Sequence, residues 1–141
     1  WETLEKASTR ITNEIREINR VIWLLAPENI DSIELIATDL NASRIEVLRE
    51  ADAIAMNETQ ENGMMKEIWQ FPTVMMPLHV NEKGESIVLR PVESLEAMTA
   101  RFYPMKYEVL QKIVKKIMAL ESVSSIFYDV THKPPATIEW E

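Results

Sequence analysis

The 141-residue sequence lacks cysteine and has only two glycines and two histidines. Without cysteine it can form neither a disulfide nor a thiolate metal site. A phosphate-binding loop of the Walker type needs clustered glycines, so that backbone N–H groups approach the phosphates, but Gly63 and Gly84 stand far apart. Apolar runs fall well short of the roughly 20 residues that a membrane-spanning helix needs. These absences exclude several classes of site.

The charge balance is acidic, with a formal net charge of −8 at pH 7. This charge disfavours nucleic acid, whose phosphates would be repelled, and an anionic membrane surface. Hydrophobic residues make up 46% of the chain, which is enough for a buried core, and the length suits one domain. We therefore expect an acidic, cytoplasmic domain with neither nucleic acid nor membrane as a partner.

The first 42 residues predict one helix–strand unit and a connection. Apolar residues recur at helical spacing within residues 1–16. Residues 18–25 are β-branched and aromatic enough to predict a buried strand, which Pro27 ends. Residues 28–42 show no clear period, so we expect a connection there.

A helix and a β-hairpin are predicted next. Ser43 and Glu46 form a capping-box pattern, which is typical of a helix start, and Gly63 suits the end of that helix. The following segment alternates apolar and polar residues around a turn. This pattern predicts a hairpin with strands at residues 71–80 and 87–92.

The remaining residues predict a second helix and two further strands. Pro104 suits the start of the helix, and apolar residues at helical spacing follow it. We expect strands at residues 123–130 and 136–141, joined by a proline-containing loop. The order α-β-β-α-β-β predicts an α+β fold, in which a two-layer sandwich has an antiparallel sheet with helices on one face.

An internal similarity divides the chain further. Residues 1–6 parallel residues 107–112, and residues 18–23 parallel residues 123–128. One explanation is that any two amphipathic helix–strand units look alike. The matched Glu, Leu and Lys positions favour a repeat instead. We therefore interpret residues 1–27 as the tail of a first, partial copy.

Residues suited to catalysis are scarce. His79 and His132 lie far apart in the sequence, and neither stands at metal-ligand spacing from an acidic residue. With 23 acidic residues in the chain, carboxylate pairs are inevitable and carry no signal. The sequence contains no nucleophile motif. We predict no catalytic residue and no metal ligand in this chain.

The C-terminal residues carry a specific motif. Residues 133–141 read Lys-Pro-Pro-Ala-Thr-Ile-Glu-Trp-Glu, and Tyr128-Asp129-Val130 precedes them. This ending resembles that of GMP synthases. The resemblance extends, in the same order and at similar spacing, to residues 44–54, 68–72, 89–94 and 98–100. We therefore interpret residues 43–141 as a GMP synthase C-terminal domain.

The resemblance implies that the chain is part of a larger enzyme. The family converts XMP to GMP with ATP, Mg and ammonia released from glutamine, in ATP-pyrophosphatase and glutaminase domains that are absent here. The C-terminal domain joins subunits and lays its last residues over XMP. The expected partners are XMP, those two domains, and a second copy in a homodimer or an internal pseudo-dimer. No cofactor is expected in this chain itself. The alternative is a pure dimerisation module without nucleotide contact.

The resemblance also implies four XMP contacts in this sequence, namely Gln70, Lys133, Ile138 through its backbone, and Glu139. A lysine suits a phosphate, and Glu139 can accept hydrogen bonds from xanthine N–H groups or the ribose. The alternatives are that Lys133 is a solvated loop residue and that Glu139 faces solvent from an edge strand.

Arg20 is the fifth candidate. Many family members have, where this chain has Ser125, an arginine that reaches the phosphate bound by the other subunit. The first copy keeps an arginine at the matching place, Arg20. We predict that residues 1–27 act as a pseudo-subunit that presents Arg20 to the phosphate bound by the same chain. The alternative is a surface ion pair with Glu14 or Glu17.

Three other residues have expected roles around this site. Arg90 and Arg101 would either add positive charge near the phosphate or pair with a nearby acid such as Glu93. Trp140 is expected to anchor the tail by packing rather than to stack on the ligand.

Overall fold

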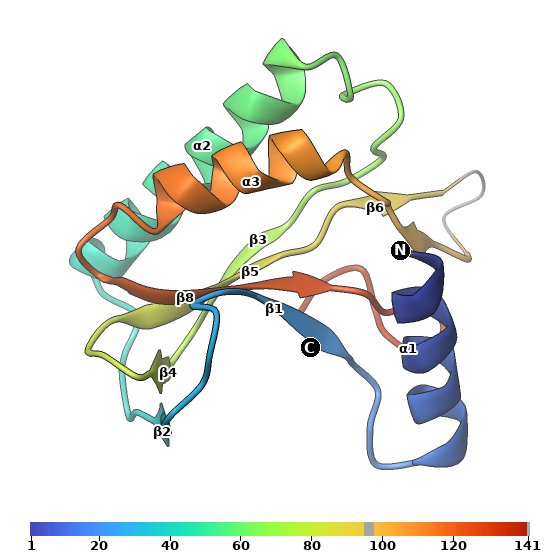
Figure 1. The fold of residues 1–141 in the computed structure, drawn as a ribbon, viewed down its shortest axis with the longest axis horizontal. Coiled ribbons are helices and arrows are strands. Elements are labelled where there is room, and N and C mark those ends of the chain that lie inside the picture. Colours follow the sequence, from blue (N-terminus) through green and yellow to red (C-terminus); the bar gives the residue numbers. More distant parts are fainter. Residues whose placement is uncertain (95–97, 141) are drawn as a thin grey trace.

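A four-stranded sheet forms the centre of the computed structural model, which describes residues 1–94 and 98–140 (Figure 1). The strand order is β1-β8-β5-β3, where β1 is Ile22–Ala26, β8 is Val123–Asp129, β5 is Glu85–Leu89 and β3 is Thr73–Met76. The inner strands β5 and β8 run parallel, and each outer strand pairs antiparallel with its inner neighbour.

Two helices cover one face of this sheet (Figure 1). They are α2 (Ala42–Glu61) and α3 (Tyr107–Ile117), which pack against each other. Alternate residues of the inner strands belong to the same main core as the buried residues of both helices. These strand residues are Ile87, Leu89, Ile126 and Tyr128. The predicted two-layer α+β sandwich is therefore confirmed.

The sheet is mixed, although the sequence predicted an antiparallel one. β3 and β5 form the predicted hairpin, although the predicted strand at residues 71–80 is divided, with residues 78–80 in a separate strand. In the chain, α3 lies between β5 and β8. A helix that crosses back over a sheet returns the chain to the edge where the preceding strand began. The next strand therefore runs parallel to that strand, as β8 does to β5.

The start of α2 lies two residues before the predicted one. Its N-cap is Asn41, whose Oδ1 accepts the Arg44 N–H at 3.1 Å. The Ser43 hydroxyl, predicted to be the cap, donates to the same oxygen at 2.7 Å. Asparagine and serine cap helices equally well, so the pattern alone did not separate them. The predicted end is confirmed, since Gly63 follows the helix with φ +71°.

No strand forms within residues 136–140, where the sequence predicted one, and Glu141 lies outside the described residues. The carbonyls of Thr137 and Ile138 accept hydrogen bonds from the Arg90 side chain. These backbone groups therefore bind a side chain in place of a neighbouring strand.

The other face of the sheet carries a smaller core. Val88 of β5 and Phe127 of β8 cluster there with Val80 of β4 (Leu78–Val80), and Trp140 packs against them as expected. β4 pairs antiparallel with β2 (Ile33–Leu35). The segment expected to be a plain connection therefore contains a short strand.

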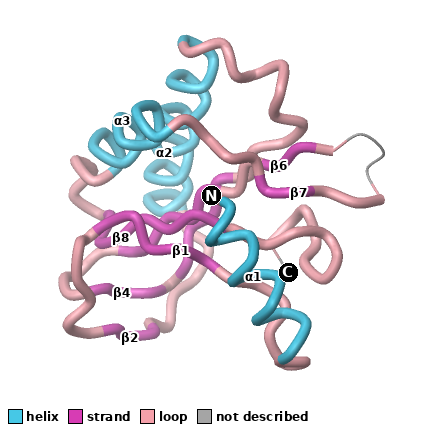
Figure 2. The backbone as a smooth tube through the Cα atoms, turned by 45° about the vertical axis from the view of Figure 1, so that its right-hand side comes forward, coloured by secondary structure: helices cyan, strands magenta, loops and turns pink. Residues whose placement is uncertain are grey.

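The N-terminal unit consists of α1 (Glu2–Glu14) and β1. α1 lies apart from α2 and α3, at the side of the molecule where the chain ends (Figure 2). The Trp1 ring packs against the rings of Trp23, Phe102 and Tyr128, with centroids 5.7, 5.8 and 4.8 Å away. β1 pairs directly with β8, its expected counterpart in the repeat. The division into residues 1–27, 28–42 and 43–141 stays a prediction.

A small sheet completes the fold, in which β6 (Val92–Glu93) pairs antiparallel with β7 (Arg101–Phe102). No helix in the part of the chain that the structure describes is long and apolar enough to cross a membrane. The same residues contain no cluster of three or more histidine or acidic side chains that could hold a metal ion.

Candidate functional site

Three of the five predicted site residues meet beside β6 and β7. Gln70 forms an antiparallel backbone bridge with Val92 of β6, and Lys133 forms one with Ala100, directly before β7. The buried Ile138 clusters with Val92 and Ala100. These contacts bring together residues from three distant parts of the chain.

Main-chain hydrogen bonds fix the positions of Gln70 and Lys133. Val92 N donates to the Gln70 carbonyl at 2.8 Å, and Lys133 N donates to the Ala100 carbonyl at 2.8 Å. Gln70 is exposed and Lys133 is half-buried. A polar side chain on a fixed backbone suits ligand binding, because less conformational entropy is lost when the ligand binds.

The residue before Lys133 anchors its loop. The ring of His132 stacks on Phe102, with centroids 5.2 Å apart and planes at 6°, and its Nε2 lies 3.0 Å from Glu5 Oε1. Arg101 pairs with the same oxygen. The hydrogen bond from Arg101 is the main cause of the lowered pKa of Glu5, which burial opposes and His132 reinforces. The loop is therefore tied to both α1 and β7.

Arg90 lies fully buried directly after β5. Its Nε donates to the Ile138 carbonyl at 2.9 Å, its Nη2 to the Thr137 carbonyl at 2.5 Å, and its Nη1 to the Thr131 carbonyl at 3.3 Å. Nη1 also lies 2.6 Å from Asp129 Oδ2. Burial lowers the pKa of Arg90, and the Asp129 charge opposes this shift.

The sequence analysis did not predict this ion pair, although the sequence contains one indication of it. Leu89 lies opposite Tyr128 in the sheet, so the residues after them, Arg90 and Asp129, are neighbours. Each charged residue comes directly after apolar strand residues. That pattern indicates a pair only once the strands are known to be adjacent and parallel. Arg90 therefore pairs with Asp129, whereas the ion pair considered as one alternative from the sequence was with Glu93.

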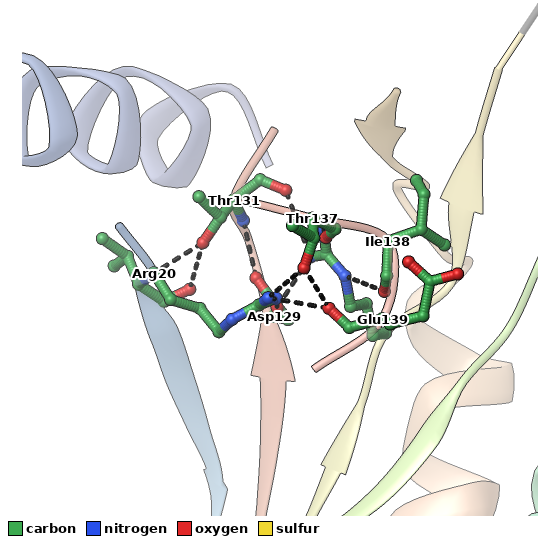
Figure 3. A network of polar contacts seen from close by, with 8 residues as sticks. Arg20, Asp129, Thr131, Thr137, Ile138 and Glu139 are labelled. Carbon is green, nitrogen blue, oxygen red and sulfur yellow. Dashed lines mark hydrogen bonds and ion pairs between the residues drawn. The ribbon is translucent and has the colours of Figure 1, made fainter. Parts of the chain in front are cut away.

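Arg20, which precedes β1, binds the same carboxylate (Figure 3). Its Nη1 lies 2.5 Å from Asp129 Oδ2, and its Nη2 donates to the main-chain carbonyl of Glu139 at 3.1 Å. The guanidinium also lies over the Trp140 ring, 4.3 Å from its centroid. Only 9% of the Arg20 side chain is exposed. The ion-pair partner is thus Asp129 rather than a glutamate of its own segment.

Glu139 has a fixed backbone and an accessible side chain. Its main-chain carbonyl accepts hydrogen bonds from Arg20 and, at 2.5 Å, from the Thr137 hydroxyl. The residue is exposed, and Figure 3 shows its carboxylate pointing away from Arg20 and Asp129. Glu139, Gln70 and Lys133 thus carry a carboxylate, an amide and an ammonium group, each of which can bind a polar ligand by hydrogen bonds or charge.

Comparison with known proteins identifies related sequences. The family model for the GMP synthase C terminal domain matches residues 57–140. The whole chain aligns with a probable glutamine-hydrolyzing GMP synthase of Leptospira interrogans at 38% identity, covering 24% of that protein. It also aligns over its whole length with the GMP synthases of Halothermothrix orenii, at 35% identity and 31% coverage of that protein, and Streptococcus mutans, at 32% and 30%. The chain therefore spans about a quarter to a third of the length of these relatives.

Proposed function

The chain belongs to the GMP synthase C-terminal domain family, and on that premise we propose that it binds XMP and joins subunits in a GMP synthase. The whole enzyme would convert XMP to GMP in the cytoplasm with ATP, Mg and ammonia from glutamine. Its ATP-pyrophosphatase and glutaminase domains would be the further partners of this chain. A homodimer or an internal pseudo-dimer would be the assembled state. By itself the chain would bind substrate without catalysis and hold no cofactor.

The observation that carries this proposal is the meeting of Gln70, Lys133 and the tail at one place. Two backbone bridges, to Val92 and Ala100, hold the first two residues there. Such convergence of polar groups from separate segments on a fixed backbone is typical of ligand sites.

Each of these residues would make a different contact with XMP. XMP is a phosphate dianion that carries a xanthine base and a ribose. Lys133 would bind its phosphate or ribose phosphate, and the Glu139 carboxylate would accept hydrogen bonds from xanthine N–H groups or the ribose. Gln70 can both donate and accept. The Ile138 carbonyl is already bound by Arg90, so the backbone of Ile138 would contribute its N–H group.

Arg20 would bind the phosphate, which its guanidinium suits. To reach a phosphate it would have to turn from Asp129, with which it pairs in the structure. Asp129 would then keep its ion pair with Arg90. Mixing full-length Arg20→Ala and Lys133→Ala chains tests this role. If Arg20 serves the site of its own chain, activity stays low after the subunits exchange, whereas recovery of activity contradicts that arrangement.

The central test is Lys133→Ala in the full-length protein that contains this chain. Loss of a charge-assisted contact, worth about 1.5–3 kcal/mol, should raise KM for XMP roughly 10- to 100-fold. Glutaminase activity should not change. Lys112→Ala removes an exposed lysine of α3 and serves as the matched control. A rise in KM below threefold would contradict the proposed contact.

A pure dimerisation module is the second candidate, because the domain is expected to join subunits. It predicts that Lys133→Ala and deletion of residues 139–141 both leave KM for XMP unchanged. Sedimentation velocity on the same variants measures whether subunit association is intact. Unchanged association with a raised KM would exclude this candidate.

A further inference from the structure

Two arginine side chains hold the C-terminal tail, which we define as residues 136–140, and one aspartate binds both arginines. Arg90 and Arg20 share the carboxylate of Asp129, and both donate hydrogen bonds to main-chain carbonyls of the tail. We propose that these three residues are a clamp that positions the tail for its ligand, and that Arg20 couples the tail to the N-terminal unit. The inference rests on the proposed function in that the tail carries two of the XMP contacts.

Arg90 is the base of the clamp. A single buried guanidinium binds the carbonyls of Thr131, Thr137 and Ile138, at 3.3, 2.5 and 2.9 Å. A guanidinium presents several N–H groups in a fixed plane, so these acceptors must take up matching positions. Lysine has one nitrogen and could not reach all three. Arg90 therefore determines the path of the tail backbone before Glu139.

Asp129 orients both arginines. Its Oδ2 lies 2.6 Å from Arg90 Nη1 and 2.5 Å from Arg20 Nη1, while its Oδ1 accepts the Thr131 N–H at 2.9 Å. One carboxylate between two guanidinium groups leaves a net positive charge in a buried place. Buried charge must be met by partners, and here the tail carbonyls meet it. The tail carbonyls thus complete the set of acceptors around the two guanidinium groups.

Arg20 supplies the second hold on the tail. It binds the Glu139 carbonyl at 3.1 Å and lies 4.3 Å from the Trp140 ring centroid, so it contacts the two tail residues that follow those bound by Arg90. Its own backbone belongs to the segment between α1 and β1. The N-terminal unit therefore contributes directly to the position of Glu139.

The clamp and a direct phosphate contact differ in when Arg20 acts. A residue that binds the phosphate contributes only when XMP is bound. A clamp residue holds the tail in the free protein as well. The state of the tail without XMP therefore separates the two roles.

The experiment measures amide hydrogen exchange of Lys133 and of Ala136 in the tail, whose N–H groups donate to the Ala100 and His132 carbonyls, in the full-length protein without XMP. Arg20→Gln should raise the exchange rate of these amides by about 10-fold or more, the factor that corresponds to loss of one such hydrogen bond. Exchange in β5 and β8 should stay unchanged, because the Arg90–Asp129 pair remains. Arg10→Gln is the matched control, since Arg10 pairs with Glu14 on the exposed surface of α1.

Two lysine variants test whether the planar guanidinium groups, and not charge alone, hold the tail. Arg20→Lys keeps the charge beside Asp129 but loses the planar fork, so tail exchange should fall between those of the wild type and Arg20→Gln. Arg90→Lys should raise tail exchange more than Arg20→Gln does. If the Arg90 variant does not fold, the Arg20 series still decides the proposal.

The outcomes separate the clamp from the proposed function. Raised tail exchange with a raised KM for XMP supports both. Raised tail exchange with an unchanged KM supports the clamp and contradicts the contact between tail and XMP. Unchanged tail exchange in Arg20→Gln overturns the clamp, and a raised KM in that variant would then assign Arg20 to the phosphate alone.

Discussion

The helix-covered face of the sheet and the end that holds the tail are stabilised by different interactions. Beneath α2 and α3 the core consists of apolar and aromatic side chains, among them Ile87, Ile113 and Ile126. Around the tail, two fully buried residues, Arg90 and Asp129, are charged. Apolar packing is non-directional, whereas each guanidinium N–H must point at an acceptor.

This difference separates two tasks within one domain. Burial of apolar area supplies most of the free energy of folding, and it tolerates many combinations of similar volume. A tail that lies on a ligand needs a defined backbone position, which a directional network imposes. The polar cluster therefore specifies where the tail lies, while the core beneath the helices stabilises the sheet that carries it.

The largest expected effect comes from breaking the polar region at Asp129. Asp129→Ala leaves Arg90 and Arg20 without their carboxylate in a buried place, which should lower the free energy of unfolding by about 3–5 kcal/mol. Urea unfolding of the variant chain measures this change. Glu46→Ala is the control, because its exposed pair with Arg49 should contribute less than about 1 kcal/mol. A loss at Asp129 no larger than at Glu46 would show that the cluster is not a stabilising network.

A somewhat smaller effect is expected from the apolar region. Ile113 is fully buried in α3, and Ile113→Ala should lower the free energy of unfolding by about 3 kcal/mol through lost burial and the cavity it leaves. Amide exchange of Lys133 and Ala136 should stay as in the wild type, because the proposed clamp predicts that the tail opens locally, without unfolding of the sheet. Faster tail exchange in this variant would mean that the two regions unfold as one unit and would weaken the comparison.

The elements of the sandwich were readable from local sequence patterns. Apolar periodicity predicted the helix that became α3, and alternation around a turn predicted the hairpin of β3 and β5. The parallel pairing of β5 with β8 was not readable, because it depends on how α3 crosses the sheet. The prediction of a last strand was wrong because Arg90, which is distant in sequence, binds the carbonyls that would otherwise join a sheet.

The candidate site was readable only where a family motif marked it. The C-terminal ending pointed to Lys133, Ile138 and Glu139, and a second segment pointed to Gln70. No family motif pointed to the residues of the clamp. Arg20 and Asp129 are 109 residues apart, and their contact exists only because β1 pairs with β8. Periodicity reports which face of an element is buried, but it does not report which buried charges meet.

The smallest expected effect is at Glu5 of α1, which accepts hydrogen bonds from Arg101 and His132. The Arg101 hydrogen bond is the main reason that the pKa of Glu5 is lowered from 4.5. A carboxyl whose pKa is lowered by folding stabilises the folded state above its unfolded pKa. That contribution is lost as pH falls through the lowered value.

Glu5→Gln should therefore lower the melting temperature slightly at pH 7, by an amount that corresponds to less than about 1 kcal/mol, because the side chain is 32% exposed and its charge is screened. The difference between wild type and variant should shrink as pH falls below 4.5, since the wild-type carboxyl then becomes neutral as well. Thermal unfolding between pH 7 and pH 3 measures both. Glu2→Gln is the control, because Glu2 pairs with Lys6 on the exposed face of α1. A difference that persists at pH 3 would mean that Glu5 acts through packing and not through its charge.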